Sequence, residues 1–247
     1  MKKILLVLFA LFLVIGFAAC GEGSGAGDGA NVLRMGTNAD FPPFEFWEDG
    51  EIVGLDPDLA RAIGDILGYE IEIIDMDFDA IILSVQQGQV DFGMAGMTIR
   101  DDRREFVDFT QGYFNASQRV IVRDDSAITS IADLTGVRIG AQLGTTGALF
   151  VEDNMDAELF NYQTGSDAVL ALLAGDIDAV VIDGEPARHF AAVNAGLSLL
   201  ADELTSEYYG IALAHDSPLT ARFDDALNQL RANGVLYEII DRWINVD

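Results

Sequence analysis

The chain has 247 residues, half of them hydrophobic, and a formal net charge of −27. This length allows one or two domains with a buried core, while the negative charge argues against binding nucleic acid or anionic membranes, which requires basic patches. Both lysines lie at positions 2 and 3 and the only cysteine is Cys20. The rest of the chain therefore offers no amine for Schiff-base chemistry and no thiol nucleophile.

Residues 1–19 are typical of a removed signal peptide, with a basic start, an apolar run at 4–17 and small residues before Cys20. The run is too short for a comfortable membrane span. F-A-A-C resembles a lipoprotein box, although Phe17 stands where an aliphatic residue is usual. We predict an extracytoplasmic protein, lipid-anchored through Cys20 at the cell surface or in the periplasm, with 20–31 as a glycine-rich tether.

The first mature segments predict alternating strands and helices. Residues 32–35 indicate a strand, and 45–46 and 52–53 indicate a hairpin around Asp49-Gly50. Asp56 is expected to be the N-cap of the next helix, which should end at Gly68. A strand at 71–74 and a second helix ending at Gly88 are expected to follow.

A weak internal repeat indicates two similar α/β lobes. Residues 79–94 and 167–181 each predict a helix, a glycine stop, an aspartate (Asp91 or Asp178) and an apolar strand. Ligands of open α/β sheets bind beyond the carboxyl ends of strands, so two such lobes should form a cleft between them.

Two extended aromatic segments are expected to cross between the lobes. We predict lobe 1 from residues 32–113 and 210–247, lobe 2 from 118–205, and a two-strand hinge near 113–118 and 205–210.

The stretch 94–114 carries the strongest sign of chemistry. It places Gly96, Thr98 and three arginines just beyond a short apolar strand, where backbone N–H groups and a guanidinium can bind an anion. The alternative is a solvated charged turn. The loop 142–147 (QLGTTG), which precedes a predicted helix, is a weaker second source of N–H donors.

Four stretches together resemble the family 3 bacterial extracellular solute-binding proteins, the polar amino acid receptors of ABC importers. They are 37–46 (TNADFPPFEF), 54–67 (GLDPDLARAIGDIL), 96–114 and 137–147 (VRIGAQLGTTG). Pro57 and Arg100 depart from the family pattern. The resemblance implies a periplasmic-binding-protein-like type II fold, no cofactor, a monomer, and ABC membrane subunits as partners.

The resemblance also implies a site for a zwitterion. Arg103 would clamp the α-carboxylate, helped by N–H groups near Thr98 and Thr146. Asp183 would bind the α-ammonium together with the Gly96 carbonyl and the Thr98 hydroxyl.

The resemblance further assigns the pocket walls. Phe41 and Phe78 would sandwich the ligand, and Asn38 and Gln142 would contact its side chain. An acidic protein with amides around the pocket favours glutamine, arginine, histidine or lysine.

Simpler roles remain open for several of these residues. Arg100 and Arg104 fit surface ion pairs, Phe41 or Phe78 fits core packing, and Asp183 fits a turn cap. His189 and His215 lack partners at metal spacing, and the Asp75, Asp77 and Asp79 alternation lacks the glycine and glutamate of an EF-hand, so we expect no metal.

Two other functions are alternatives to transport. An enzyme resembling prephenate or arogenate dehydratases would need a positioned acid; Asp40 and Glu45 are candidates, although Asp40 has no evident partner. A signalling sensor would normally add a membrane span and an output domain, whereas the chain stops at Asp247. We therefore expect a transport receptor with no catalytic residues.

Overall fold

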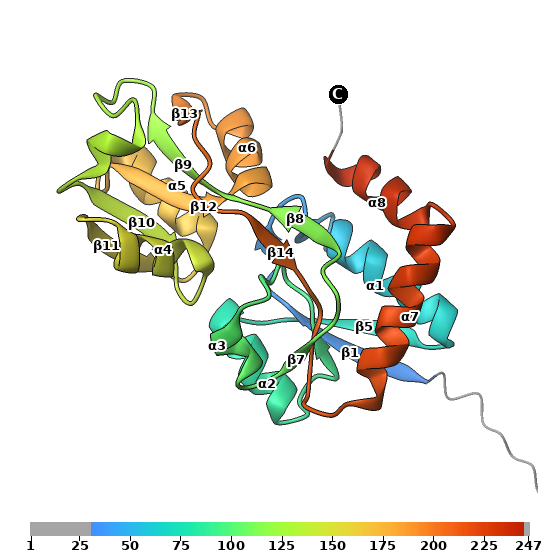
Figure 1. Cartoon of the computed structure of the whole chain (residues 1–247). Coiled ribbons are helices and arrows are strands. Elements are labelled where there is room, and N and C mark those ends of the chain that lie inside the picture. Colours follow the sequence, from blue (N-terminus) through green and yellow to red (C-terminus); the bar gives the residue numbers. More distant parts are fainter. Residues whose placement is uncertain (1–30, 245–247) are drawn as a thin grey trace, which may run out of the picture.

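The computed structural model describes residues 31–244 and contains two five-stranded sheets joined by a two-stranded ribbon (Figure 1). We call the part built on the first sheet lobe 1 and the part built on the second sheet lobe 2. The predicted signal peptide, Cys20 and tether residues 21–30 lie outside the described residues.

The sheet of lobe 1 has the strand order β5-β1-β6-β15-β7. Strand β1 is parallel to β5 and β6, whereas β15 is antiparallel to β6 and β7. The end of the chain thus supplies a strand to the sheet that its beginning forms. The bounds are β1 Val32–Thr37, β5 Glu70–Asp75, β6 Phe92–Gly93, β7 Asp108–Phe109 and β15 Ala212–Leu213.

Helices cover both faces of this sheet. Leu213 packs in one hydrophobic cluster with α1, α7 and α8, while its neighbour Ala212 packs in another with α2. Because adjacent strand residues point to opposite faces, α1, α7 and α8 lie on one side and α2 on the other. The bounds are α1 Leu55–Leu67, α2 Ile81–Gln86 (after a 3₁₀ turn, Phe78–Ala80), α3 Asp101–Arg104, α7 Pro218–Ala232 and α8 Val235–Ile244.

The predicted start of α1 is wrong by two residues. Gly54, not Asp56, is the N-cap, and Asp56 is a fully buried helical residue. Its carboxylate accepts from the Gly96 N–H at 2.9 Å and from the Tyr113 hydroxyl at 2.8 Å. These long-range partners replace the local cap bond that the sequence indicated. The predicted end is confirmed, because Gly68 is left-handed and its N–H donates to the Gly64 carbonyl.

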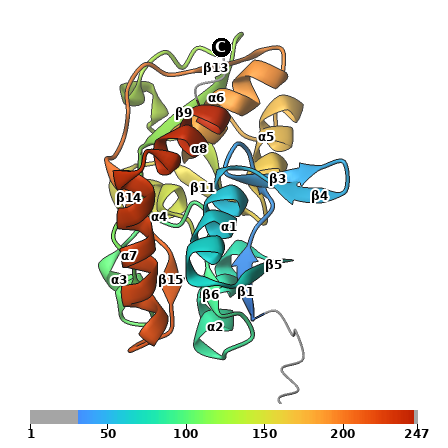
Figure 2. The same cartoon turned by 90° about the vertical axis from the view of Figure 1, so that its right-hand side faces the viewer.

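The predicted hairpin is confirmed. Strands β2 (Asp40–Phe41), β3 (Glu45–Glu48) and β4 (Glu51–Val53) form a small sheet, and the β3–β4 turn projects from the side of the molecule (Figure 2). Asp49 and Gly50 both have positive φ, 51° and 85°, the conformation that a tight hairpin turn requires.

The sheet of lobe 2 repeats the plan of lobe 1, with the order β11-β10-β12-β9-β13. Strands β10, β11 and β12 are parallel, and β9 is antiparallel to its neighbours β12 and β13. The bounds are β9 Gln118–Arg123, β10 Arg138–Gln142, β11 Glu158–Tyr162, β12 Ala179–Asp183, β13 Leu197–Leu199, α4 Thr146–Asn154, α5 Gly165–Ala174 and α6 Gly184–Val193, with a short 3₁₀ turn at Ile131–Leu134.

The internal repeat is confirmed down to its side chains. In lobe 1 the Arg34 N–H and Nε donate to Asp91 Oδ2 at 2.7 and 3.1 Å. In lobe 2 the Arg138 N–H and Nε donate to Asp178 Oδ2, both at 3.0 Å. Each guanidinium also binds the carbonyl of the glycine three residues before its aspartate. The repeated glycine and aspartate therefore hold β1 in lobe 1 and β10 in lobe 2 against the neighbouring helix–strand turn.

The ribbon between the sheets consists of β8 (Phe114–Ala116) and β14 (Glu207–Tyr209), which pair antiparallel. Both segments were predicted as extended crossings. Within residues 31–244, none of the helices has the length and apolar character needed to cross a membrane.

Candidate functional site

A pocket lies between the two lobes and is lined by residues of both. All nine residues predicted to bind a ligand lie on it, together with Glu45, Ala95 and Thr145. The nine are Asn38, Phe41, Phe78, Gly96, Thr98 and Arg103 from lobe 1 and Gln142, Thr146 and Asp183 from lobe 2. Residues separated by up to 145 positions in the chain thus meet at one place.

Arg103 supplies a buried positive charge. Its side chain lies on α3, where Arg103 is 4% exposed while the adjacent Arg104 faces solvent. Nη1 donates to the Thr98 carbonyl at 2.8 Å and Nη2 to the Gly144 carbonyl of lobe 2 at 3.0 Å. Burial, and then the charge of Arg100, lower the pKa of Arg103 to about 9, so the guanidinium is still charged at neutral pH. It has five N–H donors, which leaves donors for an anion.

Asp183 supplies a buried negative charge from the carboxyl end of β12. The Tyr209 hydroxyl donates to its Oδ1 at 2.5 Å. Burial, and then the nearby Glu207, raise the pKa of Asp183 to about 7. Asp183 is also the N-cap residue of α6, the place that the alternative role implied, but its side chain makes no capping hydrogen bond there.

Glu45 is the ionisable side chain among the three pocket residues that the sequence motifs did not assign to ligand binding. It is fully buried, and its carboxyl group lies within hydrogen-bonding reach of the equally buried carboxyl group of Asp56. Burial, and then the charge of Asp56, raise the pKa of Glu45 well above its usual range. The hairpin pairs Glu45 with Phe41. Because Phe41 was predicted to line the pocket, the four-residue spacing between the two was the one sign in the sequence that Glu45 lies there as well.

The aromatic walls depend on a glycine. Gly96 has φ of 51°, and a Cβ there would lie 2.6 Å from the Phe41 ring. Only glycine allows this close contact without strain. On the other wall the Arg103 guanidinium lies 5.2 Å from the centre of the Phe78 ring, a cation–π distance. Phe78 also packs against the core cluster under α2.

The polar side chains at the pocket already bind one another. The Gln142 Nε2 donates to Asn38 Oδ1 at 2.8 Å, which joins lobe 2 to lobe 1. The Thr98 hydroxyl donates to Glu207 at 2.6 Å, so it can face the pocket only as an acceptor. Thr146 lies in the first turn of α4 and accepts weakly from Arg100 at 3.4 Å.

A second contact between the lobes joins β2 to the start of α5. Asp40 accepts from the Ser166 N–H at 3.1 Å and from the Ser166 hydroxyl at 2.8 Å. The expectation that Asp40 lacks a partner was therefore wrong, because its partner comes from the distant start of α5. With Gln142 bound to Asn38 as well, the lobes are closed on one another.

The remaining charged candidates lie outside the pocket. Arg100 forms the expected ion pair, with Asp102, at 2.6 Å. His215 bonds to Asp108 at 2.9 Å. In the part of the chain that the structure describes, no three His, Cys, Asp or Glu side chains are grouped as metal ligands.

Comparison with known proteins gives a consistent match. Residues 33–246 match the family described as bacterial extracellular solute-binding proteins, family 3. The chain is 35% identical to the arginine-binding extracellular protein ArtP of Bacillus subtilis over 98% of both chains. It is 31% identical to the glutamine-binding protein GlnH of the same species, over 100% of this chain and 99% of GlnH.

A solved structure of similar fold is that of ArtJ, an arginine-, lysine-, histidine-binding protein from Geobacillus stearothermophilus. The TM-score is 0.84 at 33% identity, over 88% of this chain and 96% of ArtJ.

Proposed function

The chain belongs to the bacterial extracellular solute-binding proteins, family 3, and from that premise we propose that it captures a polar L-amino acid for an ABC importer. Its two-lobed α/β fold is that of the type II periplasmic binding proteins. The relatives named above are binding proteins rather than enzymes, and Asp40, one of the two acids considered for catalysis, is held by Ser166.

The observation that carries the proposal is a pair of opposite buried charges, one on each lobe, that face one pocket. Arg103 is 4% exposed and Asp183 is 6% exposed. Burying an unpaired charge is costly, and a zwitterion would neutralise both at once. The α-carboxylate would bind the Arg103 fork, and the α-ammonium would bind Asp183 and the Gly96 carbonyl.

Among polar amino acids we propose L-arginine as the preferred ligand. Glu45 is a fully buried acid whose pKa is raised by burial and by Asp56, and a cationic ligand side chain beside it would stabilise its ionised form. The names of ArtP and ArtJ point in the same direction. L-Glutamine is the second candidate, because the Asn38–Gln142 amide pair can exchange its bond for bonds to a ligand amide; histidine and lysine follow.

The ligand preference is tested by calorimetry on ligand-free protein with the twenty amino acids. We expect L-arginine to bind most tightly and to raise the melting temperature most, because a ligand of the folded state adds stability. Glu45→Gln should weaken L-arginine binding by roughly 1.5–3 kcal/mol, with a much smaller effect on L-glutamine.

The matched control is Glu48→Gln, an exposed glutamate on the same strand, which should leave both affinities unchanged. Absence of binding by all twenty amino acids would refute the proposed function. Equal losses for L-arginine and L-glutamine in Glu45→Gln would refute the assignment of Glu45 to the ligand side chain.

Closure of the lobes would complete capture. The ligand would first bind lobe 1 at Arg103, Phe41 and Phe78, and lobe 2 would then bring Asp183 and the α4 start onto it. The ribbon of β8 and β14 would act as the hinge, with lobe 1 formed by residues 32–113 and 210–247 and lobe 2 by 118–205. Only the additional affinity for the closed form drives this movement. The membrane subunits would recognise the closed form of the monomer.

Ligand binding should release a proton near neutral pH. In the free protein the pKa of Asp183 is raised to about 7, and a bound ammonium would lower it by stabilising the ionised form. Affinity should therefore be highest near pH 8, fall by up to about tenfold per pH unit below pH 7 as Asp183 binds a proton, and fall again above pH 9 as Arg103, with a pKa of about 9, loses its charge. Calorimetry in two buffers of different ionisation enthalpy at pH 6.5 measures the proton directly. Affinity that rises as pH falls below 7 would contradict this.

We also propose that Cys20 carries a lipid anchor and that the protein works at the outer face of the cytoplasmic membrane. Mass spectrometry of the membrane-bound protein should find an acylated Cys20 as the first residue. An unmodified chain released to the medium or periplasm would refute the anchor and leave the binding function intact.

A further inference from the structure

The hinge strand β14 holds two buried polar side chains that hydrogen-bond to the pocket residues Thr98 and Asp183. Along this strand Glu207 is 7% exposed, Tyr208 is 59% exposed and Tyr209 is fully buried. Alternate residues of a strand share a face, so Glu207 and Tyr209 both point inward while Tyr208 points to solvent.

The two inward side chains hydrogen-bond to residues of both lobes. The Glu207 Oε2 accepts from the Thr98 hydroxyl of lobe 1 at 2.6 Å, and its Oε1 accepts from the Thr205 hydroxyl. The Tyr209 hydroxyl donates to Asp183 of lobe 2 at 2.5 Å. The backbone contributes as well, because Thr98 forms a β-bridge with Tyr209.

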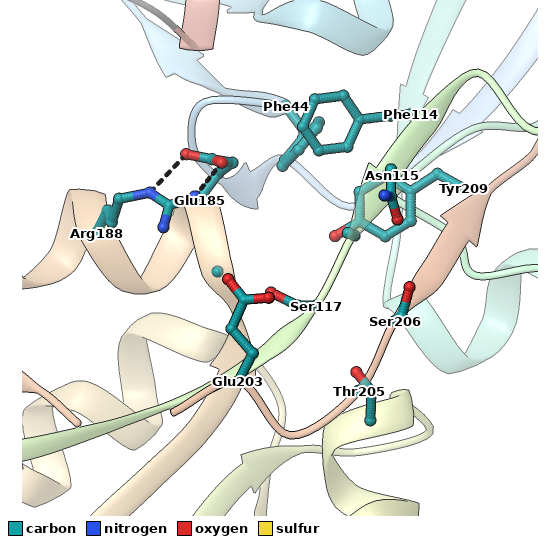
Figure 3. A pocket seen from close by; sticks show the side chains of 12 residues that line it. Phe44, Phe114, Asn115, Ser117, Glu185, Arg188, Glu203, Thr205, Ser206 and Tyr209 are labelled. Atoms are coloured by element: carbon teal, nitrogen blue, oxygen red, sulfur yellow. Dashed lines mark hydrogen bonds and ion pairs between the residues drawn. The ribbon is translucent and has the colours of Figure 1, made fainter. Parts of the chain in front are cut away.

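The ring of Tyr209 is fixed by its aromatic neighbours. Its centre lies 5.1 Å from that of Phe44 and 5.8 Å from that of Phe114. Figure 3 shows these three rings together, with Thr205 and Ser206 on the segment that leads into β14. This packing holds the strand, and with it Glu207, in a fixed position relative to the pocket.

The contact between Glu207 and Thr98 determines what Thr98 can bind. A threonine hydroxyl has one proton to donate and two positions that accept. Because the proton goes to Glu207, the Thr98 oxygen can only accept from a group in the pocket. An ammonium only donates and a carboxylate only accepts, so Thr98 attracts the first and repels the second.

We propose that Glu207 is a positioning residue: by accepting the hydrogen bond that the Thr98 hydroxyl donates, it leaves Thr98 as a pure acceptor at the ammonium end of the pocket. This inference rests on the proposed function. Two further features support it: Glu207 binds two hydroxyl donors with its two oxygens, and no ion pair with an Arg or His neutralises it within residues 31–244. A glutamine at this position has one oxygen that accepts and one NH₂ group that donates. It could accept from only one of the two hydroxyls, and the other hydroxyl would have to accept from the amide instead of donating.

The test compares two ligands that differ only in the α-amino group, L-arginine and 5-guanidinopentanoic acid, on the wild type and on Glu207→Gln. We expect Glu207→Gln to weaken L-arginine binding about tenfold and to leave binding of the deaminated analogue unchanged. Glu203→Gln, an exposed carboxylate earlier in the same segment, is the control and should affect neither ligand.

A double-mutant cycle separates positioning from a structural role. In a Thr98→Val background, which lacks the hydroxyl, Glu207→Gln should have much less effect on L-arginine than in the wild type, because coupled residues are not additive. Glu207→Asp keeps a carboxylate and should bind L-arginine more tightly than Glu207→Gln. If Glu207→Gln does not fold, the comparison of the two ligands is made on Glu207→Asp, where L-arginine should still be the one selectively weakened.

Three results would overturn the inference while the wild type still binds L-arginine: unchanged affinity in the Glu207 variants, equal weakening of both ligands, or additive effects of Thr98→Val and Glu207→Gln. A wild type that binds no amino acid would instead overturn the proposed function, and this inference with it.

Discussion

Replacing Arg103 by alanine is expected to weaken amino acid binding by roughly 3–5 kcal/mol, or about two to four decades of affinity. The ligand carboxylate would then be buried in the closed pocket without its cation. The hydrogen bond from Arg103 to the Gly144 carbonyl of lobe 2 would also be lost, which removes one contact of the closed form. Calorimetric titration with L-arginine measures the loss, and circular dichroism checks that the fold is retained.

The chain offers a matched control for this change in Arg104. It is the next residue on the same short helix but is exposed to solvent, so Arg104→Ala should bind like the wild type. Near-normal binding by a folded Arg103→Ala variant would show that the carboxylate binds elsewhere. Equal losses in the two variants would indicate a general disturbance of α3 rather than a lost ligand contact.

Replacing Asp183 by asparagine is expected to cost a similar roughly 3–5 kcal/mol of binding, because the ammonium loses its buried counter-charge. The effect on folding should have the opposite sign. The pKa of Asp183 is raised to about 7 in the folded protein, so the unfolded chain binds fewer protons than the folded chain as pH rises from about 4 to 7, and ionisation of this group destabilises the fold over that range. Without ligand, the variant should therefore be at least as stable as the wild type at pH 7.

This combination of lost binding and retained stability distinguishes a ligand contact from a structural residue. Thermal unfolding without and with L-arginine measures both quantities in one experiment. The control is Asp202→Asn, an exposed carboxylate of lobe 2, which should alter neither. A folded Asp183→Asn variant that binds L-arginine normally would exclude Asp183 as the ammonium partner.

The elements with strong local signals could be predicted from the sequence. The β3–β4 turn follows from Asp49-Gly50, and the end of α1 follows from Gly68, because each glycine adopts a positive φ at that point. The repeat of glycine and aspartate predicted equivalent strands in two lobes, and the arginine contacts to Asp91 and Asp178 explain why it is present.

The errors and omissions involve contacts between residues far apart in the chain. Asp56 is a residue type that commonly caps helices, but its carboxylate binds Gly96 and Tyr113 instead. Asp40 binds Ser166, which is 126 positions away in the chain. Local spacing contains no information about such partners. A helix-cap preference is worth only about 1 kcal/mol, so a buried network readily overrides it.

The residues of the candidate site likewise fall into those that motifs predict and those that only the fold reveals. The resemblance of the motifs placed Arg103, Asp183 and the two aromatic walls, all of which lie on one pocket. The sequence indicated Glu45 only as a catalytic acid and gave no sign of Glu207, because the burial of Glu45 beside Asp56 and the contact of Glu207 with Thr98 are visible only in three dimensions.

A crystal structure of the protein with bound L-arginine would test the division of charge between the lobes most directly. We expect both carboxylate oxygens of the ligand at the Arg103 guanidinium and the ammonium nitrogen within hydrogen-bond distance of Asp183. A ligand in the reversed orientation, or one bound away from both side chains, would contradict the account.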